Sequence, residues 1–131
     1  MVTVFVVTMT MALLLVAGLV IDGGAVLAAR RQAIDVAEQA ARAGAQAIRI
    51  ADVRTGAEPA LDPVSAAQAA EAYLDAVGRH GRVEVTGDKI EVVVSVDQRM
   101  LVLQIAGVGD VTVTGRAQAR NARVVATGDA A

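Results

Sequence analysis

The pattern of hydrophobic positions begins with one long apolar stretch, and the later elements follow from it. Residues Val2 to Ile21 contain no charged side chain, and their only polar side chains belong to Thr3, Thr8 and Thr10. A threonine hydroxyl in a helix can donate to the carbonyl one turn earlier, so these residues do not interrupt an apolar helix. About twenty residues at 1.5 Å each span roughly 30 Å, the thickness of a membrane's hydrocarbon core. The pattern predicts a membrane anchor helix over residues 1–22.

Two other structures are compatible with such a stretch. A secretory signal peptide usually has a basic start and an apolar segment of about 7 to 15 residues. This stretch is longer and starts apolar, although Val26-Leu27-Ala28 offers a cleavage site. A buried helix of a soluble domain would need apolar neighbours on every side, and the remaining chain is too small and too rich in alanine to supply them. A membrane span is therefore the favoured interpretation.

Residues 23–50 continue the helical pattern as an amphipathic extension of the anchor. Glu38 and Arg42, on the charged face, are spaced to form an ion pair. The opposite face carries a small-residue seam, which consists of Ala29, Ala33, Ala37, Ala40, Gly44 and Ala47. Because alanine and glycine bury little area each, the seam is stabilising mainly where another backbone comes very close. That partner could be the chain's own second helix and sheet, or a second subunit.

A second helix is predicted after a loop over residues 51–60. Asp62 suits the N-cap position, Pro63 suits the first helical position, and Gly78 is typical of a helix end. The apolar stripe expected on this helix consists of Ala66, Ala70, Tyr73, Leu74 and Val77. The helix is short, about four turns.

The period then changes from helical to alternating. Residues 82–96 predict a β-hairpin around a two-residue turn, in which Val85 pairs with Ile90 on one face. The same register sets Glu84 opposite Glu91 on the other face. Because like charges directly opposite are unfavourable, a third strand that carries cations would relieve the hairpin.

Residues 110–120 have the pattern of that third strand. Their polar face carries Arg116 and Arg120, and we expect one of these to lie near a hairpin glutamate. Between the strands, residues 99–107 form an apolar run that could be a short helix or an extra strand. The methionine and leucine content and the terminal Gly107 favour the helix.

These elements predict an α+β architecture of the type IV pilin kind. A long N-terminal helix and a short helix pack on a small antiparallel three-stranded sheet. The expected divisions are an anchor, an amphipathic extension, a small α+β extracytoplasmic domain and a flexible tail, over residues 1–22, 23–50, 51–125 and 126–131.

Composition excludes several classes of function. The net charge is −2, and the 12 basic and 14 acidic residues are mixed along the chain, so no basic patch points to nucleic acid. The absence of cysteine excludes disulfides and thiolate metal sites. The single histidine, His80, lies in a glycine-flanked turn far from Ser65 and Ser95, and Asp97 and Asp110 have no paired carboxylate nearby. We expect no enzymatic activity, no metal, no cofactor and no small-molecule substrate.

Several segments resemble the TadE/TadG-like proteins that assemble the Tad, or Flp, pilus. The segments are Val2–Phe5, Ala12–Val20, Ile21–Gly24, Leu27–Ala33, Ala37–Ala45, Gly107–Val113 and Ala117–Arg120. The resemblance implies a minor pilin or pseudopilin, held in the cell membrane by one span and taking part in a surface filament. Its partners would be membrane lipid and other pilin-like or Tad assembly subunits, which it would contact by helix packing.

The anchor residues expected to make these contacts are Val4, Phe5, Leu13, Leu14, Leu15, Gly18 and Ile21. Mature major pilins carry a glutamate where this chain has Phe5, which favours a minor role, with an N-terminal leader either removed or absent. Arg30 and Arg31 after the span favour a cytoplasmic C-terminal side by the positive-inside rule. The family resemblance implies the opposite orientation, which we follow.

Two further functions compete with pilus assembly. A permanently anchored accessory subunit of a secretion or transport machine would use the span as its anchor and the α+β domain as a docking surface. A membrane-anchored extracellular enzyme would have to depend on His80, the only histidine.

Overall fold

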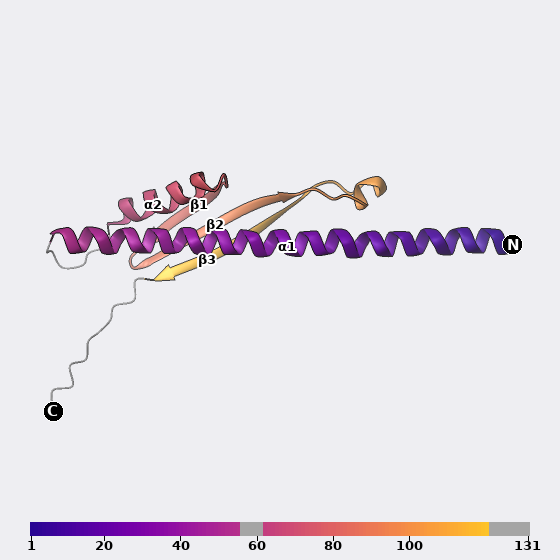
Figure 1. The fold of residues 1–131 in the computed structure, drawn as a ribbon, viewed down its shortest axis with the longest axis horizontal. Helices are drawn as coiled ribbons and strands as arrows, with labels where there is room; N and C mark the ends of the chain where they lie inside the picture. Colours follow the sequence, from indigo (N-terminus) through magenta and orange to yellow (C-terminus); the bar gives the residue numbers. More distant parts are fainter. Residues whose placement is uncertain (56–61, 121–131) are drawn as a thin grey trace, which may run out of the picture.

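The computed structural model describes residues 1–55 and 62–120, and within them all side chains except those of residues 47–55. Figure 1 shows one long helix with a small domain packed along its C-terminal half. In chain order the elements are α1 (Val2–Thr55), α2 (Pro63–Ala76), β1 (Gly81–Thr86), β2 (Lys89–Gln98), the 3-10 helix η1 (Leu103–Ala106) and β3 (Val111–Arg120). The predicted α+β, pilin-like architecture is confirmed. The expected tail over residues 126–131 lies outside the described residues.

The long helix α1 runs without interruption from the anchor into the domain. It passes through Gly23 and Gly24 as regular α-helix, and it extends to Thr55. The loop expected to begin at residue 51 was therefore placed too early, and residues 56–61 of that loop lie outside the described part. The physical reason is local, because residues 51–55 contain neither glycine nor proline and Gly56 is the first helix-breaking residue.

The start of α2 confirms the predicted cap. The Asp62 carboxylate accepts the Val64 N–H at 3.1 Å and the Ser65 hydroxyl at 2.7 Å, with Pro63 at the first helical position. The Ser65 hydroxyl, together with the Val64 N–H, holds the pKa of the Asp62 carboxyl below its ordinary value.

The apolar stripe of α2 is one residue shorter than predicted. Ala66, Ala70 and Leu74 are buried and Tyr73 is half-buried, whereas Val77 is 41% exposed. Val77 is the C-cap and no longer has helical backbone angles. Its side chain therefore does not continue the buried face formed by Ala66, Ala70 and Leu74. Gly78, with φ of 64°, then ends the helix as expected.

The sheet has the order β1-β2-β3, and both neighbouring pairs are antiparallel. The predicted hairpin register is confirmed, with Val85 opposite Ile90 and Glu84 opposite Glu91. The central strand β2 buries alternate residues, among them Ile90, Val92 and Val94, toward the helices. Its outer face is polar except at Val93.

The apolar run over residues 99–107 forms only a single 3-10 turn, η1, which ends at Gly107 in the left-handed region with φ of 86°. A short helix was the favoured prediction, and the turn bears it out only in part. The backbone N–H groups just before η1 donate to a side chain of α1, described below, which holds this segment as a loop rather than as a longer helix.

Candidate functional site

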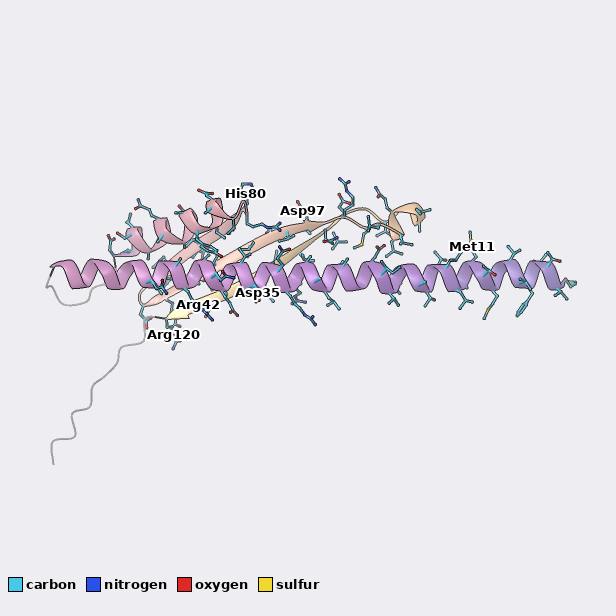
Figure 2. The ribbon with its side chains drawn as sticks, viewed as in Figure 1. Met11, Asp35, Arg42, His80, Asp97 and Arg120 are labelled. Carbon is cyan, nitrogen blue, oxygen red and sulfur yellow. The ribbon has the colours of Figure 1, made fainter. Side chains whose placement is uncertain are left out.

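The N-terminal half of α1 is exposed on almost every side. The expected anchor residues Val4, Phe5, Leu13, Leu14, Leu15 and Ile21 are between 53% and 71% exposed. Figure 2 shows their region, around the labelled Met11, as a helix whose side chains project freely beyond the domain. In the most apolar part of the helix only 6% of the residues are buried. A core helix of a soluble protein would be mostly buried, so the structure disagrees with that alternative.

Polar groups within this half satisfy one another. The hydroxyls of Thr8 and Thr10 donate to the carbonyls of Val4 and Val6, each at 2.8 Å. This is the predicted back-bonding to the previous turn. A helix with its backbone bonds closed internally, long and apolar enough to cross a membrane, meets the main requirement for a lipid-spanning segment.

The small-residue seam lies against the chain's own domain. Ala29, Ala33, Ala37, Ala40 and Gly44 are all buried. The four alanines belong to the core formed with α2, β2 and β3, and Gly44 lies against Ala66 and Ile90. Ala47 belongs to α1, but its side chain lies outside the described part of the structure. Of the two partners left open by the sequence, the intramolecular one is observed.

Two glycines show how close this packing is. A Cβ added at Gly115 of β3 would overlap the backbone of Ala33 and Ile34 on α1. A Cβ added at Gly44 would lie 2.8 Å from the carbonyl oxygen of Ala66 on α2 and 3.1 Å from Ile90. The helix therefore meets both the sheet and α2 at distances that only glycine permits.

Asp22 makes a contact that the sequence analysis did not identify. Its side chain is only 1% exposed, and its two carboxylate oxygens accept the backbone N–H groups of Leu101 at 3.2 Å, Val102 at 3.0 Å and Leu103 at 2.7 Å. Hydrogen bonds from N–H groups to a carboxylate are stronger than those to a neutral acceptor. The first charged residue after the apolar stretch thus holds the β2–β3 loop against α1.

Gly18, one turn before Asp22, is the one buried residue of the apolar stretch Val2–Ile21. A Cβ there would overlap the Val102 side chain, so the loop approaches α1 inside the apolar stretch itself. The sequence offered two signals for this contact: a glycine and a lone carboxylate at helical spacing, and an apolar run over residues 99–107. Neither signal identifies the other as its partner.

The exposed face of the sheet is charged and internally paired. Arg116 Nε lies 3.1 Å from Glu91 Oε1, and Gln118 donates to the other Glu91 oxygen at 2.9 Å. This confirms the predicted relief of the hairpin's glutamates by the third strand, and Arg116 supplies it. On α1, Glu38 and Arg42 form the predicted ion pair at 3.6 Å, with both side chains largely exposed. Such surface pairs contribute little stability.

His80, labelled in Figure 2, lies in the exposed turn between α2 and β1. It is one of the residues that line an open hollow on the charged sheet face. Arg82, Glu84, Glu91 and Arg116 line the same hollow. Among the side chains that the structure describes, no three histidine or carboxylate groups lie close enough together to hold a metal ion.

The anchor and the seam are also the part of the chain for which a known family is found. Residues 1–47 match the family model of Tad, Flp pilus-assembly TadE/G-like proteins. The resemblance expected from the sequence is confirmed over these residues. No curated protein and no solved structure matches the chain.

The matched range covers most of α1 and ends within it. It contains the apolar half of α1, Asp22 and the seam as far as Ala47. The Tad match does not reach the sheet, so the resemblance suggested for residues 107–113 and 117–120 lies beyond it. The Tad match thus shows that this N-terminal helix is similar to the corresponding part of TadE/G-like pilus-assembly proteins.

Proposed function

We propose that this chain is a non-enzymatic, single-pass membrane component of a Tad/Flp-type pilus, with its α+β domain on the extracytoplasmic side. The Tad match over residues 1–47 supports a role in pilus assembly. A minor pilin or pseudopilin role fits the small domain carried on one helix. The divisions into anchor, extension and domain at residues 22 and 50 belong to this proposal.

One observation carries the proposal: a single unbroken helix has two halves in different surroundings. From Val2 to Ile21 its large apolar side chains contact almost nothing in the chain, whereas from Ala29 onward its small side chains are buried. Exposed apolar area of that extent is unfavourable in water. Lipid, or a bundle of similar helices in a filament, would remove it.

The same division indicates where partner subunits would pack. The seam from Ala29 to Gly44 is already covered by the chain's own sheet and α2. Helix packing with other pilin-like subunits would therefore use the exposed anchor side chains, such as Phe5 and Leu14.

The contacts of Asp22 and Gly18 also favour retention of the anchor. Cleavage after Ala28, the alternative allowed by the sequence, would remove both residues. It would leave the N–H groups of Leu101, Val102 and Leu103 without the carboxylate that they now share. A domain built around its anchor in this way is unlike a passenger released from a signal peptide.

A second candidate is a permanently anchored accessory subunit of a secretion or transport machine. The Asp22 contact favours it, because the contact ties the domain to the end of the span and suits a subunit that stays in the membrane. Pilus and accessory roles share the anchor and differ in whether the chain leaves the membrane for a filament.

A charged side chain introduced into the anchor tests membrane insertion, which both proposed roles require. Leu14→Lys places an ammonium near the middle of the span, which costs about 2.5 to 3.5 kcal/mol in membrane insertion. Val64→Lys is the matched control, since Leu14 and Val64 are each 61% exposed and Val64 lies on α2 outside the anchor. We expect the Leu14 variant, and not the Val64 variant, to be lost from carbonate-washed membranes of the cells that make the pilus.

Recovery of the wild-type chain in sheared surface filaments supports the pilus role. Recovery only in membranes, with filaments lacking it, supports the accessory subunit. Equal membrane retention of both lysine variants would contradict the anchor and with it both roles.

A further inference from the structure

The β2–β3 loop carries an apolar surface that the fold leaves uncovered. Residues 101–109, here called the apolar loop, contain no charged side chain, and Gln104 is their only polar one. Leu101 is 67% exposed, Ile105 is 89% exposed and Val108 is 43% exposed. Elsewhere in the domain, exposed positions are mostly charged or polar.

The loop is held at the level of the anchor's end. Val102 packs on Gly18, and Asp22 binds three successive N–H groups of the loop. Gly18 lies about 4 to 5 Å inside the apolar stretch at 1.5 Å per residue. Figure 1 shows the loop extending beyond the sheet, alongside α1 and toward its N-terminal half. The loop's exposed side chains therefore share the depth of the last turn of the span.

Six of the loop's backbone N–H groups are paired within the protein, which suits an apolar surrounding. Besides the three N–H groups bound by Asp22, those of Ile105, Gly107 and Val108 donate to the carbonyls of Val102, Gln104 and Leu103 at 3.0 to 3.2 Å. Backbone in contact with lipid must have its polar groups paired within the protein. An ordinary solvent-facing loop has no such requirement.

We propose that the apolar loop enters the membrane interface beside α1, with Leu101 and Ile105 in the lipid, as a second contact that sets the domain's height and tilt. This inference rests on the proposed membrane anchor. Lipid is favoured over a second copy of the chain because the loop is fixed to the anchor itself, so the medium around the exposed last turn of the anchor also surrounds Ile105. Arg99 and Asp110, which flank the apolar part, would remain among the headgroups.

The chain has no cysteine, so a fluorophore attached to a single introduced cysteine reports the surroundings of that one position. Ile105→Cys, Met11→Cys and Val64→Cys are each labelled with the fluorophore NBD and reconstituted into phosphatidylcholine–phosphatidylglycerol vesicles. All three positions are well exposed, so the substitutions leave the core intact. Met11 reports the anchor, and Val64 reports an exposed apolar position at the far end of the domain. The readouts are the NBD emission maximum and its quenching by lipids with a nitroxide on the acyl chain.

We expect blue-shifted emission and strong lipid quenching at both residues 11 and 105, and neither at residue 64. Lipid quenching at 11 with water-like emission at 105 would overturn the loop contact and leave the anchor intact. A third outcome is blue-shifted emission at residue 105 without lipid quenching, with a blue shift that increases with the protein-to-lipid ratio. This outcome would assign the loop to a contact with a second copy of the chain and would also overturn the proposal. Water-like emission at 11 would overturn the anchor, and the loop contact with it.

Discussion

The two halves of α1 share one backbone and differ in the size of the side chains that they present. The N-terminal half presents valine, leucine, methionine and phenylalanine outward, and residues such as Leu14 remain more than half exposed. The C-terminal half is buried through alanine and glycine, and Ala33, Ala37 and Ala40 are fully buried. The more hydrophobic half is thus the one that the protein itself leaves uncovered.

This comparison separates hydrophobicity from burial within the protein. A large apolar side chain loses contact with water equally well in lipid or against other helices. A small side chain is useful where a sheet or a helix must come close, because it lets the two backbones approach. Side-chain size along α1 therefore marks which half meets its own domain and which half is left for lipid or partners.

The strongest disruption of the packed half is expected from Gly115→Leu. Its Cβ alone overlaps the backbone of α1 at Ala33 and Ile34, which cannot move as a flexible side chain can. We expect a loss of about 3 kcal/mol or more in the free energy of unfolding, at the upper end of overpacking effects. Thermal unfolding of the full chain in detergent micelles, followed by circular dichroism, measures it. Gly24→Ala is the control, since an added Cβ there meets nothing within 4 Å.

A smaller loss is expected from enlarging the seam itself. Ala40→Leu adds three carbons at a fully buried position, and overpacking of this kind costs about 1 to 3 kcal/mol. The matched substitution Ala28→Leu lies on the exposed side of the same helix and should leave the melting temperature nearly unchanged. Equal melting of the two variants would mean that the seam does not pack on the sheet.

Loss of the Asp22 carboxylate should act locally, where the two halves meet. Asp22→Ala leaves three part-buried backbone N–H groups of the loop without their acceptor, while the seam and the sheet keep their contacts. We expect faster amide hydrogen exchange at Leu101, Val102 and Leu103 and unchanged exchange in β2. Asp22→Asn, which retains one acceptor oxygen, should be intermediate. Uniform acceleration throughout the domain would contradict a local role.

The smallest effect concerns the cap of α2, which lies far from the anchor. The folded-state pKa of Asp62 is lowered, so its ionised form contributes stability at neutral pH, and this contribution is lost as the pH falls through the lowered value. Asp62→Asn keeps a capping oxygen without this titration. We expect wild type to exceed the Asn variant slightly in melting temperature at about pH 7 and to lose that advantage below about pH 4. A difference in melting temperature that stays the same at both pH values would indicate that the charge of Asp62 does not contribute to the cap.

Much of the domain could be predicted because short-range rules determine it. The Asp62-Pro63 start and the Gly78 stop bounded α2, and the two-residue turn determined the register that sets Glu84 opposite Glu91. That unfavourable pair in turn predicted a cationic third strand, and Arg116 is found there. The end of α1 at Thr55 was missed because the loop prediction depended on Gly56 and Pro59, which both lie beyond the last helical residue.

By itself the sequence determined the apolar anchor, the periodicities and the resemblance to the Tad family, since each depends on residues that are neighbours in the chain. Only the tertiary structure decided that the seam packs on the chain's own sheet and that Asp22 binds the β2–β3 loop. Asp22 and Val102 are 80 positions apart. Their contact exists because α1 and the sheet bring both to one place, and no local pattern encodes which distant segments meet.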